Sequence, residues 1–416
     1  MSKQKECEES KKNKIYRVGI DARFFGLENK GLGRYTKELI EHLDALNKKL
    51  EVESLPRQMT WDQKSIEYYI FLRKNNFDKY KPSAKNIHKV KADYKWYSWA
   101  EQLFFPRLIN KYNLDLMHFT HFNAPIFYRK KFIVTIHDLI LFHYPTIRNT
   151  TLNKLVYFFK LTAYHFAIRT VVKKANKIIA ISEFTKQDII NSLKIKKEKI
   201  KVVYEGAEFA MNKLEKSSKE ENTNVKNAIF KKYGIINKYL LYVGNAYPHK
   251  NLERLVLAFN KLEIKGGSKL QLVLVGKKDY FYEKLEKFID ENNIKNIIIT
   301  DYISDLELSD LYLRTELFVF PSLYEGFGLP PLEALAKGVP VVSSSESSLR
   351  EILQDKVIYF NPKSVKSIRE GIEQALQNEK KILNSNDREK IKNKYSWVRM
   401  TKTTIEIYKK VINVKQ

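Results

Sequence analysis

The chain has 416 residues and a single cysteine, Cys7, so it can form no internal disulfide and has no cysteine-rich metal site. Such sparing use of cysteine fits a reducing compartment. The first residues lack the apolar core of a secretory signal, and no run of roughly 18 apolar residues occurs. We therefore expect a cytoplasmic protein without a membrane-spanning helix.

Acidic residues are scarce as well, because 75 Lys and Arg face 48 Asp and Glu, a net charge of +27. Residues 1–200 hold 39 basic and 20 acidic residues (+19), and residues 201–416 hold 36 and 28 (+8). A basic N-terminal half attracts lipid headgroups, a phosphate-bearing substrate or nucleic acid, although a solvated lysine-rich surface has the same composition. No nucleic-acid-binding module is recognisable, so we expect no nucleic-acid partner.

Apolar runs of strand length alternate with longer helical patterns, which is typical of βαβ units on parallel sheets. The polar stretch 212–227 interrupts this alternation and has the composition of a linker. We therefore predict two α/β domains in tandem. The predicted boundaries are a flexible tail at 1–14, a first domain at 15–205, a linker at 206–236, a second domain at 237–396 and a final helix at 397–416.

The expected strands and helices follow from these runs. Strands are expected at 16–20, 116–119, 132–136, 178–181, 200–203, 239–243, 270–275, 296–300, 317–320, 339–343 and 357–360. Helices are expected near 32–46, 97–111, 150–174, 183–193, 250–263, 280–291, 328–337, 347–353 and 364–378. The stretch 56–95 is interpreted as mixed loop with short elements, and the last 30 residues as one amphipathic helix.

Glycine is also sparse, with 14 residues, so each glycine points to a turn or a close approach of the backbone. After the first strand, a loop with Gly26, Gly31 and Gly33 leads into a helix. The amide groups at that helix start suit a diphosphate, and Arg34 adds positive charge. The full Rossmann fingerprint is absent because Thr36 occupies the third glycine position, so a flexible loop explains the pattern equally well.

Two further segments place polar residues where strands end. His137 and Asp138 directly follow a buried strand, at the carboxyl end where ligands bind in α/β folds. His137 is either a binding residue or a satisfied structural one, and Asp138 lacks the companion ligands that a metal needs. In segment 242–251 a strand ends at Gly244 and Lys250 opens a helix. Helix starts favour acidic residues, so a lysine there indicates an anionic ligand.

The segment EGFGLPPLE carries the most specific signal. Glu325 lies in a glycine-rich turn before a helix, and Glu333 lies on that helix with seven residues between them. Phe327, Gly328 and Leu329 supply amide groups at the helix entrance, and the two prolines suit its first turn. The two carboxylates are therefore placed to hold two different hydroxyl groups of one ligand.

With these motifs the chain resembles the retaining glycosyltransferases of family 4 over nearly its whole length. The resemblance rests on the glycine-rich first loop, I-H-D, A-I-S-E-F-T-K at 180–186, the V-G…K-N segment and above all the family's E-x7-E motif. It implies an α/β protein of GT-B fold. Two Rossmann-like domains would enclose a deep cleft between them, and the last helix would cross back to the first domain.

The resemblance assigns three residues to catalysis. Glu325 would bind the donor sugar near the reacting carbon, as nucleophile, base or electrostatic stabiliser. Lys250 would neutralise the leaving diphosphate, and His137 would touch the donor sugar. No metal is expected, because no D-x-D-type motif lies at a plausible place.

The resemblance also implies the donor-binding residues. Glu333 would bind the ribose hydroxyls, and the other expected contacts are Gly31, Gly33, Arg34, Asn245, Phe327, Gly328 and Leu329. Asn245 departs from the family pattern, because many members carry arginine there. Either one phosphate contact is missing, or Arg34, His249 or another basic residue supplies it.

Members with a similar D-A-R…G-x-G-R-Y opening include mannosyltransferases of bacterial surface-polysaccharide assembly. This predicts a hexosyltransferase without a cofactor, using GDP-mannose in preference to UDP-sugars and a glycan or lipid-linked acceptor. The basic, apolar segment 154–177 predicts peripheral contact with an anionic membrane on its inner face. Two alternatives remain: a GT-B sugar-nucleotide epimerase and a catalytically silent nucleotide-sugar-binding protein.

Overall fold

The computed structural model describes residues 14–26, 30–52, 66–145, 154–207, 230–263, 270–377 and 383–413. The chain forms two compact units. Unit 1 comprises Met1–Leu139, Phe158–Glu205 and Trp397–Gln416, and unit 2 comprises Ile140–Tyr157 and Gly206–Ser396. The predicted tail and linker lie mostly outside the described residues. Residues 140–157, which the sequence places in the first domain, group with unit 2.

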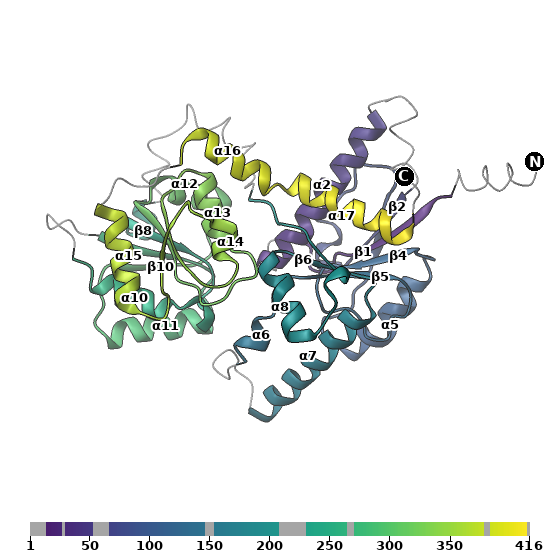
Figure 1. The fold of residues 1–416 in the computed structure, drawn as a ribbon, viewed down its shortest axis with the longest axis horizontal. Helices are drawn as coiled ribbons and strands as arrows, with labels where there is room; N and C mark the ends of the chain where they lie inside the picture. The colour runs from purple at the N-terminus through teal and green to yellow at the C-terminus, as the bar shows by residue number, and fades with distance from the viewer. Residues whose placement is uncertain are drawn as a thin grey trace, which may run out of the picture. The chain divides into compact units, whose positions relative to one another are not determined.

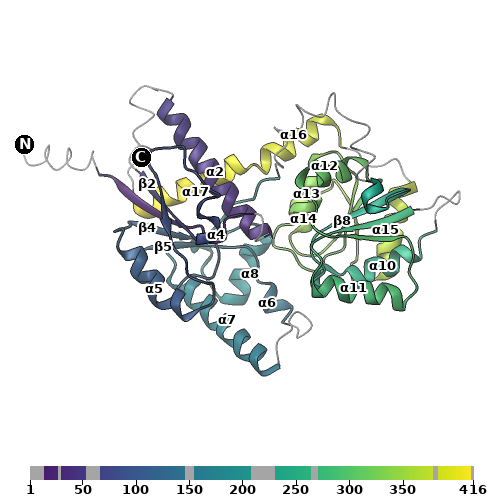
Figure 2. The same ribbon diagram turned by 180° about the vertical axis from the view of Figure 1, so that it is seen from behind.

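Unit 1 is built on a seven-stranded parallel sheet with the order β3-β2-β1-β4-β5-β6-β7. Helices α2 and α17 lie on one face of the sheet, and α5 and α7 lie on the other (Figures 1 and 2). In chain order the elements are β1 (Tyr16–Asp21), α2 (Lys30–Val52), β2 (Ile66–Leu72), α4 (Lys74–Phe77), β3 (Ile87–Lys91), α5 (Trp99–Asn110), β4 (Leu116–Phe119), β5 (Phe132–Ile136), α7 (Lys154–Lys174, from Phe158 on in this unit), β6 (Lys177–Ala180), α8 (Glu183–Leu193), the 3-10 turn η3 (Lys197–Lys199), β7 (Ile200–Val202) and α17 (Trp397–Ile412).

Unit 2 is built on a six-stranded parallel sheet with the order β10-β9-β8-β11-β12-β13. Its central strand β11 is a continuous apolar run, the fully buried LFVF, as expected for a sheet covered on both faces. Its elements are α6 (Ile140–His143), β8 (Lys238–Val243), the 3-10 turn η5 (Pro248–Lys250), α10 (Leu252–Asn260), β9 (Leu270–Val275), α11 (Tyr280–Glu291), β10 (Ile297–Thr300), α12 (Asp305–Arg314), β11 (Leu317–Phe320), α13 (Leu329–Ala336), β12 (Val341–Ser344), α14 (Leu349–Leu353), β13 (Ile358–Phe360), α15 (Val365–Gln377) and α16 (Ser385–Lys394).

The eleven expected strands are all present, within a residue or two of their predicted ends. Two more, β2 and β3, lie in the stretch interpreted as mixed loop. β3 reads IHKVK and forms the edge of the sheet, where polar residues are tolerated, so its sequence lacks an apolar run. Helix α12 was also missed, although Ser304 and Glu307 form a capping box at its start.

The C-terminal helix belongs to unit 1, as predicted. Helix α17 packs on α2 and β4, and its Tyr408 hydroxyl lies 2.7 Å from Nδ1 of His118 in β4. The expectation of one continuous helix over the last 30 residues is wrong. Helix α16 ends at Lys394, and Tyr395 leaves the helical conformation before α17 begins at Trp397.

The strand order sets where a ligand can bind. In each sheet the order reverses beside the first strand, between β1 and β4 in unit 1 and between β8 and β11 in unit 2. Ligands of open α/β sheets bind at such a switch point, outside the carboxyl ends of the strands. Among the described helices none is long and apolar enough to cross a membrane.

Candidate functional site

The switch point of unit 2 brings two predicted catalytic residues together. Lys250 ends η5, which follows β8, and Glu325 lies in the turn after β11. The Lys250 Nζ lies 2.5 Å from Glu325 Oε1, and the two side chains are 14% and 11% exposed. Two residues 75 positions apart thus form a largely buried ion pair where a ligand is expected. Lys250 lies just before α10 rather than inside it.

The turn that carries Glu325 is held by two serines at the start of α14. The Glu325 amide donates to the Ser347 hydroxyl at 2.9 Å, and the Ser348 hydroxyl donates to the Glu325 carbonyl at 3.0 Å. Ser347 has a φ of 57°, an unusual conformation for this residue type. These serines fix the glutamate from the loop after β12, and the sequence analysis did not identify them.

The start of α13 concentrates its amide donors in a short stretch. Gly328 is the N-cap, with a φ of 92°, and a Cβ there would lie 2.6 Å from Leu349 Cδ2. Leu329 is the first helical residue. Pro330 and Pro331 follow and have no N–H groups. Any amide donor at this helix start therefore belongs to Leu329 or to a residue before it, which is the stretch that the sequence singled out.

Glu333 lies in the second turn of α13 and is 4% exposed. A buried carboxylate in the helix beside the candidate site is consistent in position with the predicted binding role. The E-x7-E segment thus folds as predicted, with one glutamate in the turn and the other in the helix.

Asn245 is occupied in holding its own turn. Its side-chain oxygen accepts from the Tyr247 amide at 3.2 Å, and its carbonyl accepts from the Tyr242 hydroxyl at 2.8 Å. The neighbouring Gly244 carbonyl accepts from the Tyr282 hydroxyl at 2.8 Å. The arginine of the family pattern is thus replaced by an amide that braces the turn between β8 and η5.

His249 does not supply the missing positive charge. It is 5% exposed, and burial together with the charge of Lys250 lowers its pKa to about 3. The imidazole is therefore neutral near pH 7, which removes one of the cations considered for the phosphate. Arg34, the other cation considered, belongs to unit 1, where its guanidinium lies 6.0 Å from the ring centre of Trp397.

In unit 1, His137 follows β5 and binds protein groups through both ring nitrogens. Nε2 donates to the Thr120 carbonyl at 2.9 Å, and Nδ1 lies 3.2 Å from Oε1 of Glu205. Burial alone would lower the His137 pKa, but the hydrogen bond and charge of Glu205 outweigh it and raise the pKa. Two acceptors on one ring and the raised pKa both favour the imidazolium form, paired with Glu205.

Glu205 was not singled out from the sequence, although a usable signal was present. It follows β7 closely, at the carboxyl edge of the parallel sheet that also carries His137. The rule that identified His137 applies equally to Glu205.

The predicted loop at Gly31 and Gly33 is wrong, because both glycines lie in the first turn of α2. The amide groups of a first helical turn lack intrahelical acceptors, so the predicted supply of donors remains. Two residues after Gly33, the Tyr35 ring meets the His137 ring edge-on at 4.7 Å between centres. The start of α2 and His137 therefore lie at the same edge of the sheet.

The D-A-R segment forms a buried ionic cluster. The fully buried Arg23 binds Asp21 through Nε at 2.8 Å and Nη2 at 2.7 Å, and Nη2 also lies 2.7 Å from Oε1 of Glu101. Asn123 donates to the same Glu101 oxygen at 2.8 Å. Burial alone would lower the Arg23 pKa, but its two acidic partners raise it. These residues tie β1 to α5, a structural role.

No group of three or more His, Cys, Asp or Glu residues suited to a metal occurs within the described ranges. Metal-independent transfer stays a prediction.

Two family models match the chain in succession. The model described as Glycosyltransferase Family 4 matches residues 29–209, and the model described as Glycosyl transferases group 1 matches residues 225–395. The two matches fall on the two sheets, and together they cover most of the chain.

Among similar curated proteins are two O-antigen mannosyltransferases. O-antigen chain mannosyltransferase RfbU of Salmonella typhimurium is 27% identical over 282 residues, 68% of this chain and 70% of that protein. O-antigen chain mannosyltransferase B of Escherichia coli is 28% identical over 301 residues, 69% of this chain and 74% of that protein. Among solved structures, sucrose-phosphate synthase from Thermosynechococcus elongatus matches with a TM-score of 0.69 at 16% identity, over 96% of this chain and 100% of that one. That likeness shows the GT-B fold.

Proposed function

The chain belongs to the family 4 glycosyltransferases, and from that premise we propose that it is a retaining hexosyltransferase that moves mannose from GDP-mannose to a glycan or lipid-linked saccharide. The observation that carries the proposal is the buried Lys250–Glu325 pair at the switch point of unit 2. Mannose is favoured because both O-antigen relatives are named as mannosyltransferases, which also supports a role in surface-polysaccharide synthesis.

In this proposal the bond between the sugar C1 and the donor phosphate oxygen breaks while the acceptor oxygen bonds to C1 on the same face. The departing diphosphate takes the acceptor's proton. Lys250 and the amides at the start of α13 would stabilise the developing negative charge. The Lys250 ammonium would then bind both the Glu325 carboxylate and the diphosphate. The Glu325 carboxylate would stabilise positive charge at C1.

Glu333 is proposed to bind the ribose hydroxyls, with Phe327, Gly328 and Leu329 facing the sugar and phosphates. His137 is also proposed to bind the donor sugar, and the amides at the start of α2 are proposed to bind the diphosphate. As an imidazolium whose two N–H groups already bind Thr120 and Glu205, His137 would act on the donor through its positive charge, and it would not act as a general base.

We propose that transfer needs neither a metal nor a cofactor, because Lys250 and helix amides take the role of the cation. Activity should survive EDTA. Loss of activity with EDTA, restored by Mg²⁺ or Mn²⁺, would overturn this assignment.

We also propose peripheral membrane association through unit 1, and no nucleic-acid partner. Support comes from the charge of residues 101–200, which hold 17 basic and 6 acidic residues. Basic residues beside an anionic membrane contribute about 1 kcal/mol each. A membrane surface is also where a lipid-linked acceptor would be found.

A thermal-shift screen of nucleotides and nucleotide-sugars tests the donor. A ligand at 100 times its dissociation constant stabilises the folded protein by roughly 2.7 kcal/mol, which is readily seen. GDP-mannose should raise the melting temperature most, ahead of UDP-sugars. If no nucleotide or nucleotide-sugar shifts it, the transferase assignment fails. Release of a free epimerised sugar or nucleotide-sugar without transfer to an acceptor would favour an epimerase.

A further inference from the structure

Helix α7 of unit 1 carries apolar side chains that the described part of the protein leaves uncovered. None of the residues from Phe158 to Ala167 is buried, although this segment reads FFKLTAYHFA. Phe158, Phe159 and Phe166 are 63%, 70% and 61% exposed. A helix that is apolar around most of its circumference is normally buried, so this half of α7 suits a partner that covers it.

Helix α5 and the loop after β4 add further exposed apolar groups. Trp99, Leu103 and Phe104 of α5 are 79%, 44% and 47% exposed, and Phe127 of the loop is 48% exposed. Isolated exposed apolar residues are ordinary on protein surfaces. Seven large exposed apolar residues gathered on two neighbouring helices and the loop after β4 are unusual.

One loop fixes the two helices side by side. The Ile126 amide donates to Oε1 of Gln102 in α5 at 2.8 Å, and the Lys174 ammonium of α7 donates to the Ile126 carbonyl at 2.7 Å. In the same loop the Phe122 ring packs edge-on against Tyr164 of α7, with 5.1 Å between ring centres. Both views place α5 and α7 on the same face of the sheet (Figures 1 and 2). The docking face is defined as Trp99, Leu103, Phe104, Phe127, Phe158, Phe159 and Phe166.

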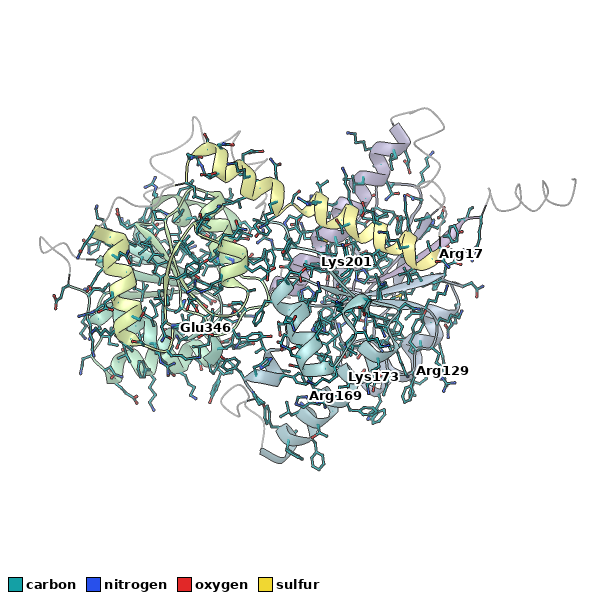
Figure 3. The ribbon with its side chains drawn as sticks, viewed as in Figure 1. Arg17, Arg129, Arg169, Lys173, Lys201 and Glu346 are labelled. Atoms are coloured by element: carbon teal, nitrogen blue, oxygen red, sulfur yellow. The ribbon has the colours of Figure 1, made fainter. Side chains whose placement is uncertain are left out.

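The charge around the docking face has one sign. Segments 99–111, 122–131 and 158–174 contain one acidic residue, Glu101, which is fully buried against Arg23. Figure 3 labels three of the basic residues, Arg129 and, on α7, Arg169 and Lys173, in the region of these helices. The exposed basic residues of the three segments are Arg107, Lys111, Arg129, Lys130, Lys131, Lys160, Arg169, Lys173 and Lys174.

We propose that the docking face binds a bilayer that contains anionic lipid, with its aromatic rings inserted between headgroups and its basic residues beside them. Exposed aromatic rings favour the membrane interface, because the apolar acyl chains lie on one side of it and hydrated headgroups on the other. Basic side chains spread over two helices match a diffuse layer of negative charge better than they match one compact acidic partner. This deepens the membrane association proposed above by naming the surface responsible, and it does not depend on the identity of the donor.

Vesicle co-sedimentation tests the docking face directly. The full chain should bind vesicles of phosphatidylcholine mixed with phosphatidylglycerol, and bind vesicles of phosphatidylcholine alone much more weakly. The double variant Phe158→Ser/Phe159→Ser should lose about tenfold or more in binding, because two exposed rings no longer insert. The matched control is Leu306→Ser/Leu313→Ser on α12, which removes two side chains that are 58% and 61% exposed in unit 2. The control should bind as the wild type does.

A second readout reports insertion itself. Lipids brominated on their acyl chains should quench tryptophan fluorescence in the wild type, and Trp99→Phe should lose most of that quenching. Transfer to a water-soluble acceptor should be unchanged in all these variants, which separates failure of the docking face from failure of the transferase assignment. An unchanged melting temperature with GDP verifies that each variant is folded.

Three results would overturn the proposal. One is equal binding of the wild type and the Phe158/Phe159 variant to anionic vesicles. Another is equal binding of the wild type to neutral and anionic vesicles. The third is concentration-dependent dimerisation that the Phe158/Phe159 variant abolishes, which would assign the surface to a second copy of the chain.

Discussion

Replacing Glu325 by glutamine removes one charge from a buried ion pair and leaves the other without its partner. The Glu325 and Lys250 side chains are 11% and 14% exposed, and their charged atoms lie 2.5 Å apart. At an effective dielectric constant of about 20, two unit charges at that distance attract each other by about 7 kcal/mol. The cost of removing both charges from water offsets much of this attraction. Loss of one partner of a buried pair is therefore expected to cost about 3–5 kcal/mol.

A double-mutant cycle measures the interaction. Glu325→Gln and Lys250→Met should each lower the free energy of unfolding by about 3–5 kcal/mol in urea denaturation. The double variant should lose little more than either single variant, because the second change removes a charge that already lacks its partner. The coupling energy should then be at least about 2 kcal/mol. The exposed pair Lys278 and Glu286 is the control, and we expect little coupling there because water screens it.

The same variants separate binding from catalysis. Glu325→Gln frees Lys250 for the diphosphate, so GDP affinity should hold or increase while kcat falls by about 100-fold. Lys250→Met should weaken GDP binding. Additive stability losses, with a coupling below about 0.5 kcal/mol, would refute the ion pair. A normal kcat in Glu325→Gln would remove this residue from the active site.

Three further predictions concern single positions. Gly328→Ala should lower the free energy of unfolding by about 2–3 kcal/mol, because the φ of Gly328 is 92° and the added methyl group would meet Leu349. Gly26→Ala is the control and should cost less, because Gly26 has a φ of 113° but open space around it. Equal losses of the two variants in urea denaturation would contradict the steric argument. Glu205 raises the His137 pKa above its unfolded value, so the stability that Glu205 contributes should be fully present below about pH 6.5 and be lost as pH rises through the folded pKa. Urea denaturation of the wild type and Glu205→Gln across pH should therefore give a difference that shrinks toward alkaline pH, and a constant difference would refute the imidazolium. Glu333→Gln should raise the donor KM with a smaller change in kcat, because ribose contacts are equal in ground and transition states; steady-state kinetics matching those of Glu325→Gln would contradict this division of roles.

The sequence predicted the fold wherever its physical signal was local. The apolar runs of β9 and β11 and the E-x7-E segment are readable because buried parallel strands need continuous apolar residues and a helix entrance needs glycine and proline. β3 was missed because an edge strand does not need such a run. The break between α16 and α17 was missed because it is short: only Tyr395 and Ser396 separate the two helices.

The site was predictable as a set of residue types but not as a set of contacts. Lys250 and Glu325 were both identified from the sequence. Their ion pair forms because β8 and β11 are neighbours in the sheet, and a single sequence does not show that residues 75 positions apart are brought together in this way. Ser347 and Ser348 carry no motif, and their role follows from the position of the loop after β12. The neutral state of His249 follows from burial that a single sequence does not display.

The central claim is that this chain transfers a hexose with retention of configuration, and the configuration of the product tests it most directly. The purified protein is incubated with GDP-α-mannose and a panel of mannosides and lipid-linked saccharides, and the anomeric proton of the new linkage is followed by NMR. We predict an α-mannoside, formed by the wild type and formed about 100-fold more slowly by Glu325→Gln. A β-linked product, or transfer that proceeds at the wild-type rate in Glu325→Gln, would contradict the account.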